Sequence, residues 1–167
     1  MAKNVAWAAV FSLVAALLQS TLFFHLSLYH TIPDFTLGIV VYSAYVNGTM
    51  TGQLSGFFSG LLLDFISNAP LGLNALIRTV MGAVTGLLKG TFFLDTVVLP
   101  MILCAAATLF KALMLFLLNL LLAGAVPSYS LAAPTLWIEL LLNTASAPFL
   151  FGLLKLFQPL LVGKGDN

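Results

Sequence analysis

Long hydrophobic stretches separated by short polar turns dominate this chain. A helix that crosses the hydrocarbon core of a bilayer needs roughly 20 predominantly apolar residues, within a range of about 17 to 25. Six stretches fit or approach this length, and they cover residues 4–24, 33–46, 50–65, 71–88, 97–123 and 134–157. The pattern therefore predicts a single transmembrane domain over residues 1–167, folded as an all-α bundle of six helices.

Turn residues mark several of the expected helix ends. Pro33 and Asp34 suit the start of the second helix. The N–H groups of the first turn have no partner within a helix, so proline loses no hydrogen bond there, and an acid is favoured at the positive end of the helix dipole. Asn47-Gly48 breaks the chain before the third helix, and Pro148 predicts a kink in the sixth. The third and fourth helices are short, so we expect them to cross upright or to be partly re-entrant.

Composition places the chain in a membrane. Hydrophobic residues make up 61% and charged residues 7% of the 167 residues, and the mean hydropathy is +1.12. Soluble domains carry about 25% charged residues, so the apolar surface of this chain must face lipid. A net charge of +1 gives no strong positive surface potential that would attract nucleic acid. A single cysteine, Cys104, excludes an internal disulfide, and His25 and His30 lack neighbouring ligands at a metal-binding spacing.

Lysine positions indicate the orientation. With six crossings, Lys3, Lys89, Lys155 and Lys164 all fall on one side of the membrane, whereas the loops on the other side contain no lysine or arginine. Positively charged loop residues collect in the cytoplasm. We therefore expect a multi-pass protein with both termini in the cytoplasm.

Glycines four residues apart mark one face of the third and fourth helices. The third carries Gly52, Gly56 and Gly60, and the fourth carries Gly82 and Gly86. Such faces let two helix backbones approach closely in lipid. In the first interpretation the two helices pack on each other as a hairpin. In the alternative, one glycine face docks the transmembrane helix of a partner.

Four charged residues lie inside the expected helices: Asp64, Arg78, Lys111 and Glu139. Counting along each helix at about 1.5 Å per residue places all four in the outer half of the membrane. An unpaired charge near the bilayer centre costs about 2.5–3.5 kcal/mol, so these charges should pair or border a solvated pocket. In a structural role, Asp64 and Arg78 stabilise their own hairpin while Lys111 extends to the interface. In a functional role, they line a polar pocket for a ligand or partner, and Arg78 points to Asp64 or Glu139.

The segment DFISNAPLG, residues 64–72, predicts the outer turn of the hairpin. Asp64 ends the third helix, Asn68 and Pro70 reverse the chain, and Gly72 allows a neighbouring segment to approach. Catalytic motifs are absent from the sequence, with no nucleophile elbow and no H-E-x-x-H pattern. We therefore expect a protein that is not an enzyme and carries neither a metal nor a cofactor.

Two segments resemble a known protein family. PDFTLGIVV begins at Pro33, and GFFSGLLLDFISNAPLGLNALIRTVMGAVTGLLKG runs from Gly56 to Gly90. A proline-acid step before the second span, a glycine-rich helix ending in Leu-Leu-Leu-Asp, and Pro-Leu-Gly before a G-x-x-x-G helix resemble the rod shape-determining MreD family. From Thr91 onward the resemblance is little more than hydrophobicity, so Lys111 and Glu139 inherit no role from it.

This resemblance implies a non-enzymatic subunit of the cell-elongation machinery in the bacterial cytoplasmic membrane. Its implied partner is the bitopic protein MreC, and it works beside the MreB filament and the glycosyltransferase and transpeptidase that build lateral peptidoglycan. The family is also similar in architecture to the six-helix substrate-binding subunits of energy-coupling-factor transporters. A second function therefore stays open, in which an outward-facing intramembrane pocket binds a vitamin. A third is an assembly subunit whose charges only hold the helices together.

Overall fold

The computed structural model describes residues 2–21, 31–67, 69–91, 97–122 and 134–161. These residues form seven helices and no strand. The helices are α1 (Ala2–Thr21), α2 (Phe35–Asn47), α3 (Thr49–Ile66), α4 (Leu73–Leu87), α5 (Val98–Leu121), α6 (Pro134–Leu156) and α7 (Gln158–Leu161). The ends of α1 to α6 lie within a few residues of the sequence prediction, whereas the short helix α7 was not expected.

Two helices, α5 and α6, are long and apolar enough to cross a membrane. Their 24 and 23 residues correspond to about 36 and 34 Å at the helical rise, against a hydrocarbon core of about 30 Å. The apolar helices α2 and α4 have 13 and 15 residues and reach only about 20 and 22 Å. The all-α class is confirmed for the described residues, while six crossings remain a prediction.

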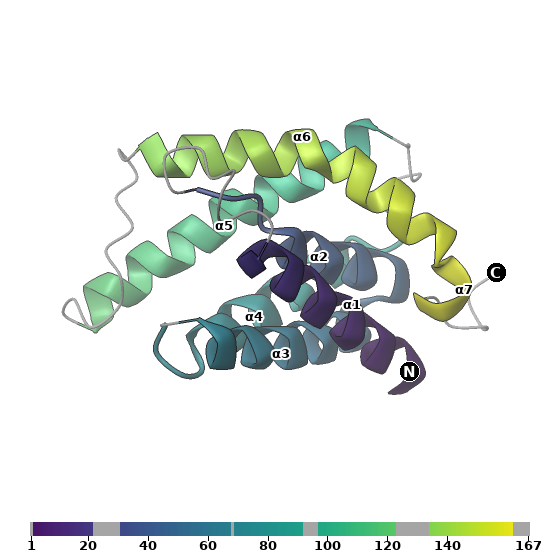
Figure 1. Ribbon diagram of the computed structural model, residues 1–167, viewed down its shortest axis with the longest axis horizontal. Coiled ribbons are helices and arrows are strands. Elements are labelled where there is room, and N and C mark those ends of the chain that lie inside the picture. Colours follow the sequence, from purple (N-terminus) through teal and green to yellow (C-terminus); the bar gives the residue numbers. More distant parts are fainter. Residues whose placement is uncertain (1, 22–30, 68, 92–96, 123–133, 162–167) are drawn as a thin grey trace.

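The helices form two groups that lie side by side (Figure 1). α1 to α4 make one compact group, which we call the bundle, and α5 and α6 lie together along one side of it as the arm. The start of α1 and the helix α7 lie at one end of the molecule, which we call the terminal end (Figure 1). The turn between α3 and α4 lies at the opposite hairpin end, and the C-terminal part of α5 extends past it (Figure 1).

Close backbone contact joins α3 to α4. A Cβ atom added to Gly56 would overlap the carbonyl group of Arg78, and one added to Gly82 would overlap the backbone of Gly52. The glycine faces of the two helices therefore pack on each other within the molecule, and neither is left open to the helix of a partner. The glycines of this contact are Gly52, Gly56, Gly60, Gly82 and Gly86.

A polar tie holds the terminal end. Gly48 alone separates α2 from α3, with a φ of 94° that favours glycine. Beside it, the Asn47 amide donates to the carbonyl oxygen of Leu161 at 2.8 Å and accepts from the Asn4 amide at 3.0 Å. Lys89 Nζ donates to the Asn47 carbonyl at 3.5 Å. These contacts bring the ends of α1, α2, α4 and α7 together.

Three of the four lysines that were expected on the cytoplasmic side are described, and they lie at a common end. Lys3 precedes Asn4 in the first turn of α1, Lys89 contacts Asn47, and Lys155 lies in the last turn of α6. All three lie towards the terminal end, while Lys164 lies outside the described residues. The arrangement agrees with cytoplasmic termini, although the orientation itself remains a prediction.

Candidate functional site

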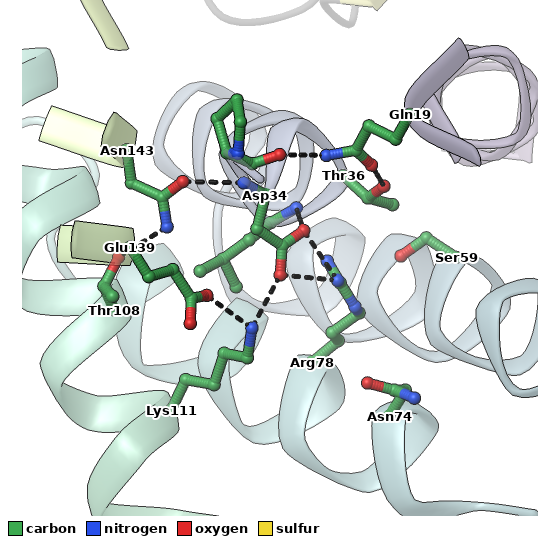
Figure 2. A network of polar contacts seen from close by, with 12 residues as sticks. Gln19, Asp34, Thr36, Ser59, Asn74, Arg78, Thr108, Lys111, Glu139 and Asn143 are labelled. Atoms are coloured by element: carbon green, nitrogen blue, oxygen red, sulfur yellow. Dashed lines mark hydrogen bonds and ion pairs between the residues drawn. The ribbon is translucent and has the colours of Figure 1, made fainter. Parts of the chain in front are cut away.

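Asp34 lies at the centre of a largely buried charged cluster (Figure 2). It directly precedes α2, and its Oδ1 accepts the backbone N–H of Leu37 at 3.0 Å, so it caps the helix. The proline-acid step therefore begins the helix two residues later than the sequence suggested. The same carboxylate also contacts cations from two other helices, which the sequence reading did not foresee.

Arg78 of α4 pairs with this carboxylate. Its Nη2 donates to Asp34 Oδ1 at 2.8 Å and to Oδ2 at 3.0 Å, and its side chain is 2% exposed. The expectation that Arg78 points to Asp64 or Glu139 is wrong, because the interlocked α3–α4 contact directs this side chain toward the start of α2 (Figure 2).

Lys111 of α5 joins the arm to the bundle. Its Nζ donates to Asp34 Oδ2 at 3.0 Å and to Glu139 Oε1 of α6 at 2.7 Å. The expectation that Lys111 extends alone to the interface is wrong, because two carboxylates within reach offer stronger partners than headgroup water does. Its side chain is 19% exposed.

Charge is balanced within this cluster. The order of contacts is Arg78–Asp34–Lys111–Glu139, so two acids neutralise two bases. Pairing offsets much of the cost of removing each charge from water, but a buried pair contributes little net stability beyond that. The cluster therefore specifies how the helices meet more than it stabilises them.

Neutral polar side chains surround the charges. Asn143 Oδ1 of α6 accepts the backbone N–H of Asp34 at 2.6 Å, and its Nδ2 donates to Thr108 Oγ1 of α5 at 2.9 Å. On the other side, the Gln19 amide of α1 donates to the Pro33 carbonyl. The sequence reading missed Asn143, Thr108 and Gln19, although amide side chains inside apolar helices are a usable signal of buried polar contacts.

The Arg78 guanidinium is only partly satisfied. Within the described residues, its buried Nε and Nη1 atoms have no hydrogen-bond acceptor. Leaving a buried donor without an acceptor costs about 1–3 kcal/mol, and more for a charged group. Within the described chain, the carboxylate that pairs with Arg78 is that of Asp34.

Asp64 has a separate role at the hairpin end. Its Oδ2 accepts the backbone N–H groups of Gly72 at 3.0 Å and Ala75 at 3.1 Å, and its Oδ1 accepts from the backbone and side chain of Asn74 at 3.0 and 2.9 Å. The predicted Asp64–Arg78 pairing is wrong, because these donors at the start of α4 occupy the carboxylate.

The remaining turn residues are only partly described. The Pro70 carbonyl accepts the backbone N–H of Leu73 at 3.1 Å, and Gly72 adopts a φ of 92° just before α4. This left-handed conformation, rather than a close approach by another segment, explains the glycine, because no atom lies within 4 Å of an added Cβ. The predicted turn residue Asn68 lies outside the described residues.

A small cavity adjoins the cluster. Its volume is about 10 Å³, and Asp34, Cys104, Asn143 and Ser146 are among the residues that line it. A space of this size holds about one water molecule. Within the described chain, no group of three or more His, Cys, Asp or Glu side chains is arranged to hold a metal ion.

Comparison with known proteins identifies the family. The model of the rod shape-determining protein MreD matches residues 1–157 of the 167-residue chain. No curated protein and no solved structure matches the chain. The family match extends well beyond the two segments that carry the sequence resemblance, and it includes all four residues of the charged cluster. The chain belongs to the MreD family of rod shape-determining membrane proteins.

Proposed function

We propose that this protein is a non-enzymatic subunit of the bacterial cell-elongation complex. In this role it binds an MreC-like bitopic membrane protein and so supports lateral peptidoglycan synthesis, acting indirectly with an MreB-like filament and with the elongation glycosyltransferase and transpeptidase. The observation that carries the proposal is the family match over residues 1–157. We also propose six crossings of the cytoplasmic membrane with both termini in the cytoplasm, on the basis of the end that Lys3, Lys89 and Lys155 share.

The hairpin end is the proposed docking surface for the MreC-like partner. Three large apolar side chains are exposed there: Phe65 is 72%, Ile66 is 42% and Leu71 is 73% exposed. The turn that carries them is fixed by the hydrogen bonds of Asp64 to the start of α4. Because the glycine faces of α3 and α4 are used internally, the partner contacts this tip instead of a glycine face.

Co-purification tests the docking surface. A Phe65→Ser, Leu71→Ser variant should fold normally but recover much less of the MreC-like protein from detergent-solubilised membranes. Leu87→Ser is the matched control, since Leu87 is 71% exposed at the other end of α4. An undiminished complex and normal rod shape in the double variant would rule this surface out.

The alternative vitamin-binding function receives no support from the cavity beside Asp34, whose volume of about 10 Å³ admits one water molecule and no vitamin. Mass spectrometry of small molecules extracted from the purified protein separates the two functions. A vitamin recovered at equal molar ratio would favour a transporter subunit over an elongation subunit.

A further inference from the structure

The four charges of the cluster divide into two pairs, one in each helix group. Asp34 and Arg78 both belong to the bundle, with contacts at 2.8 and 3.0 Å. Lys111 and Glu139 both belong to the arm and contact each other at 2.7 Å. Each group therefore contains one acid and one base of its own. If the arm moved away from Asp34, each of the four charges would keep one partner of opposite charge.

Two polar contacts of Asp34 hold the arm to the bundle. They are the Lys111–Asp34 bridge at 3.0 Å and the hydrogen bond from the Asp34 N–H to Asn143 at 2.6 Å. Apolar contact also joins the groups, for example where Leu115 of α5 packs with Leu73 and Ile77 of α4. In lipid, apolar contact gives no hydrophobic drive for association, because acyl chains are equally apolar partners. The Asp34 contacts are thus the specific part of the arm's attachment near the hairpin end.

The terminal end of the arm is held differently. The Leu161 carbonyl accepts from Asn47 at 2.8 Å, and the rings of Phe157 and Phe11 lie 5.2 Å apart. Leu161 is fully buried. α6 also contains Pro148, which removes one hydrogen bond from the middle of this helix. The arm is therefore tied at one end by neutral contacts, and its ionic contact with the bundle is the Lys111–Asp34 bridge nearer the other end.

We propose that the α5–α6 arm is a hinged element, fixed near α7 and latched to the bundle by the Lys111–Asp34 bridge. Release of the latch separates the arm from the bundle at the hairpin end, while the Asp34–Arg78 and Lys111–Glu139 pairs both stay intact. This last step rests on the proposed function: a partner that docks at the hairpin end selects one arm position by binding it more tightly than the other.

Two double variants test the Lys111–Asp34 bridge at a constant number of charges, because each removes one acid and one base. Lys111→Met, Glu139→Gln removes the arm pair and with it the bridge, leaving Asp34 paired with Arg78. Arg78→Met, Glu139→Gln also removes one base and one acid, but leaves Asp34 and Lys111 bridged. Both variants keep a neutral cluster, so only the first should release the arm.

Distances between spin labels in lipid nanodiscs measure the release on the purified full chain with Cys104→Ala. One label pair, at positions 71 and 120, joins the turn to α5 near the hairpin end, where Leu71 and Leu120 are 73% and 72% exposed. A second pair, at positions 50 and 156, joins α3 to α6 near the terminal end, where Met50 and Leu156 are 57% and 76% exposed.

The arm-pair variant should add a longer distance population between positions 71 and 120 and leave the 50–156 distances unchanged. The Arg78→Met, Glu139→Gln variant should match the parent at both pairs. Parent-like 71–120 distances in the arm-pair variant would overturn the latch. Equal broadening in both variants, or at both label pairs, would also overturn it, since that reports general loosening. No partner is present, so failure of MreC-like docking would leave this result untouched.

A yield comparison checks the pairing independently. Asp34→Asn, Lys111→Met is also neutral overall, but it leaves Arg78 without its carboxylate and Glu139 without its ammonium group. This variant should accumulate in membranes at a clearly lower level than Lys111→Met, Glu139→Gln. Equal accumulation of the two would show that the charges do not act as two separate pairs, and would contradict the latch.

Discussion

Replacing Gly56 by alanine tests the tight contact between α3 and α4. In a helix, alanine is favoured over glycine by about 0.5–1 kcal/mol. Against this gain, the new Cβ would overlap the Arg78 carbonyl and come within 3.1 Å of the Thr79 nitrogen. Inserting a methyl group into a packed contact costs about 1–3 kcal/mol, and a backbone obstacle places the cost in the upper part of that range. We therefore expect a net loss of about 1–2 kcal/mol.

Gly152→Ala is the matched control, because Gly152 lies within helix α6 and nothing lies within 4 Å of an added Cβ. This variant should be more stable than the parent by about 0.5–1 kcal/mol. Unfolding in mixed detergent micelles, followed by circular dichroism, gives both values. If Gly56→Ala is as stable as Gly152→Ala, the helices are not in backbone contact and the reasoning about Arg78 placement fails with it.

Two further predictions concern the ends of the molecule. Asp64→Ala should lower the unfolding free energy by about 0.5–2 kcal/mol through loss of the hydrogen bonds to the start of α4, and Asp64→Asn should recover only part of it, because an amide nitrogen cannot accept the two N–H groups that each carboxylate oxygen accepts; thermal unfolding in detergent measures both. Asn47→Ala removes the contacts to Asn4 and to Leu161, and should make the C-terminal end more susceptible to proteolysis. An unchanged cleavage rate in the Asn47 variant would contradict the tie at the terminal end.

The helices and the hairpin follow from local patterns in the sequence. The lengths of the apolar stretches predict α1 to α6, and turn signals such as Gly48 and Pro134 mark several of their boundaries. The spacing of Gly52, Gly56 and Gly60 predicts a close-packed face, since residues four apart share one side of a helix. These features depend on neighbouring residues alone, so the sequence is sufficient for them.

The charged cluster could be predicted only in part. The rule that buried charges need partners correctly indicates that Arg78, Lys111 and Glu139 are paired, but it cannot say which acid meets which base. Asp34 lies 44 positions from Arg78 in the sequence. Its place at the start of a helix already explains why an acid occurs at this position. Its second role depends on how α2 packs against α4 and α5, which no local pattern encodes. Asp64 lies nearer to Arg78 in the sequence, but its carboxylate accepts N–H groups at the start of α4 instead.

The pairing of Arg78 with Asp34 is the central claim, and a double-mutant cycle on the unfolding free energy tests it most directly. The cycle uses Asp34→Asn, which keeps the cap on α2, together with Arg78→Met. A parallel cycle combines Asp64→Asn with Arg78→Met. We predict a coupling within the range of about 0.5–3 kcal/mol found for residues in contact, near its upper end, for Asp34 and Arg78. For Asp64 and Arg78 we predict none. Zero coupling in the first cycle, or strong coupling in the second, would contradict the account.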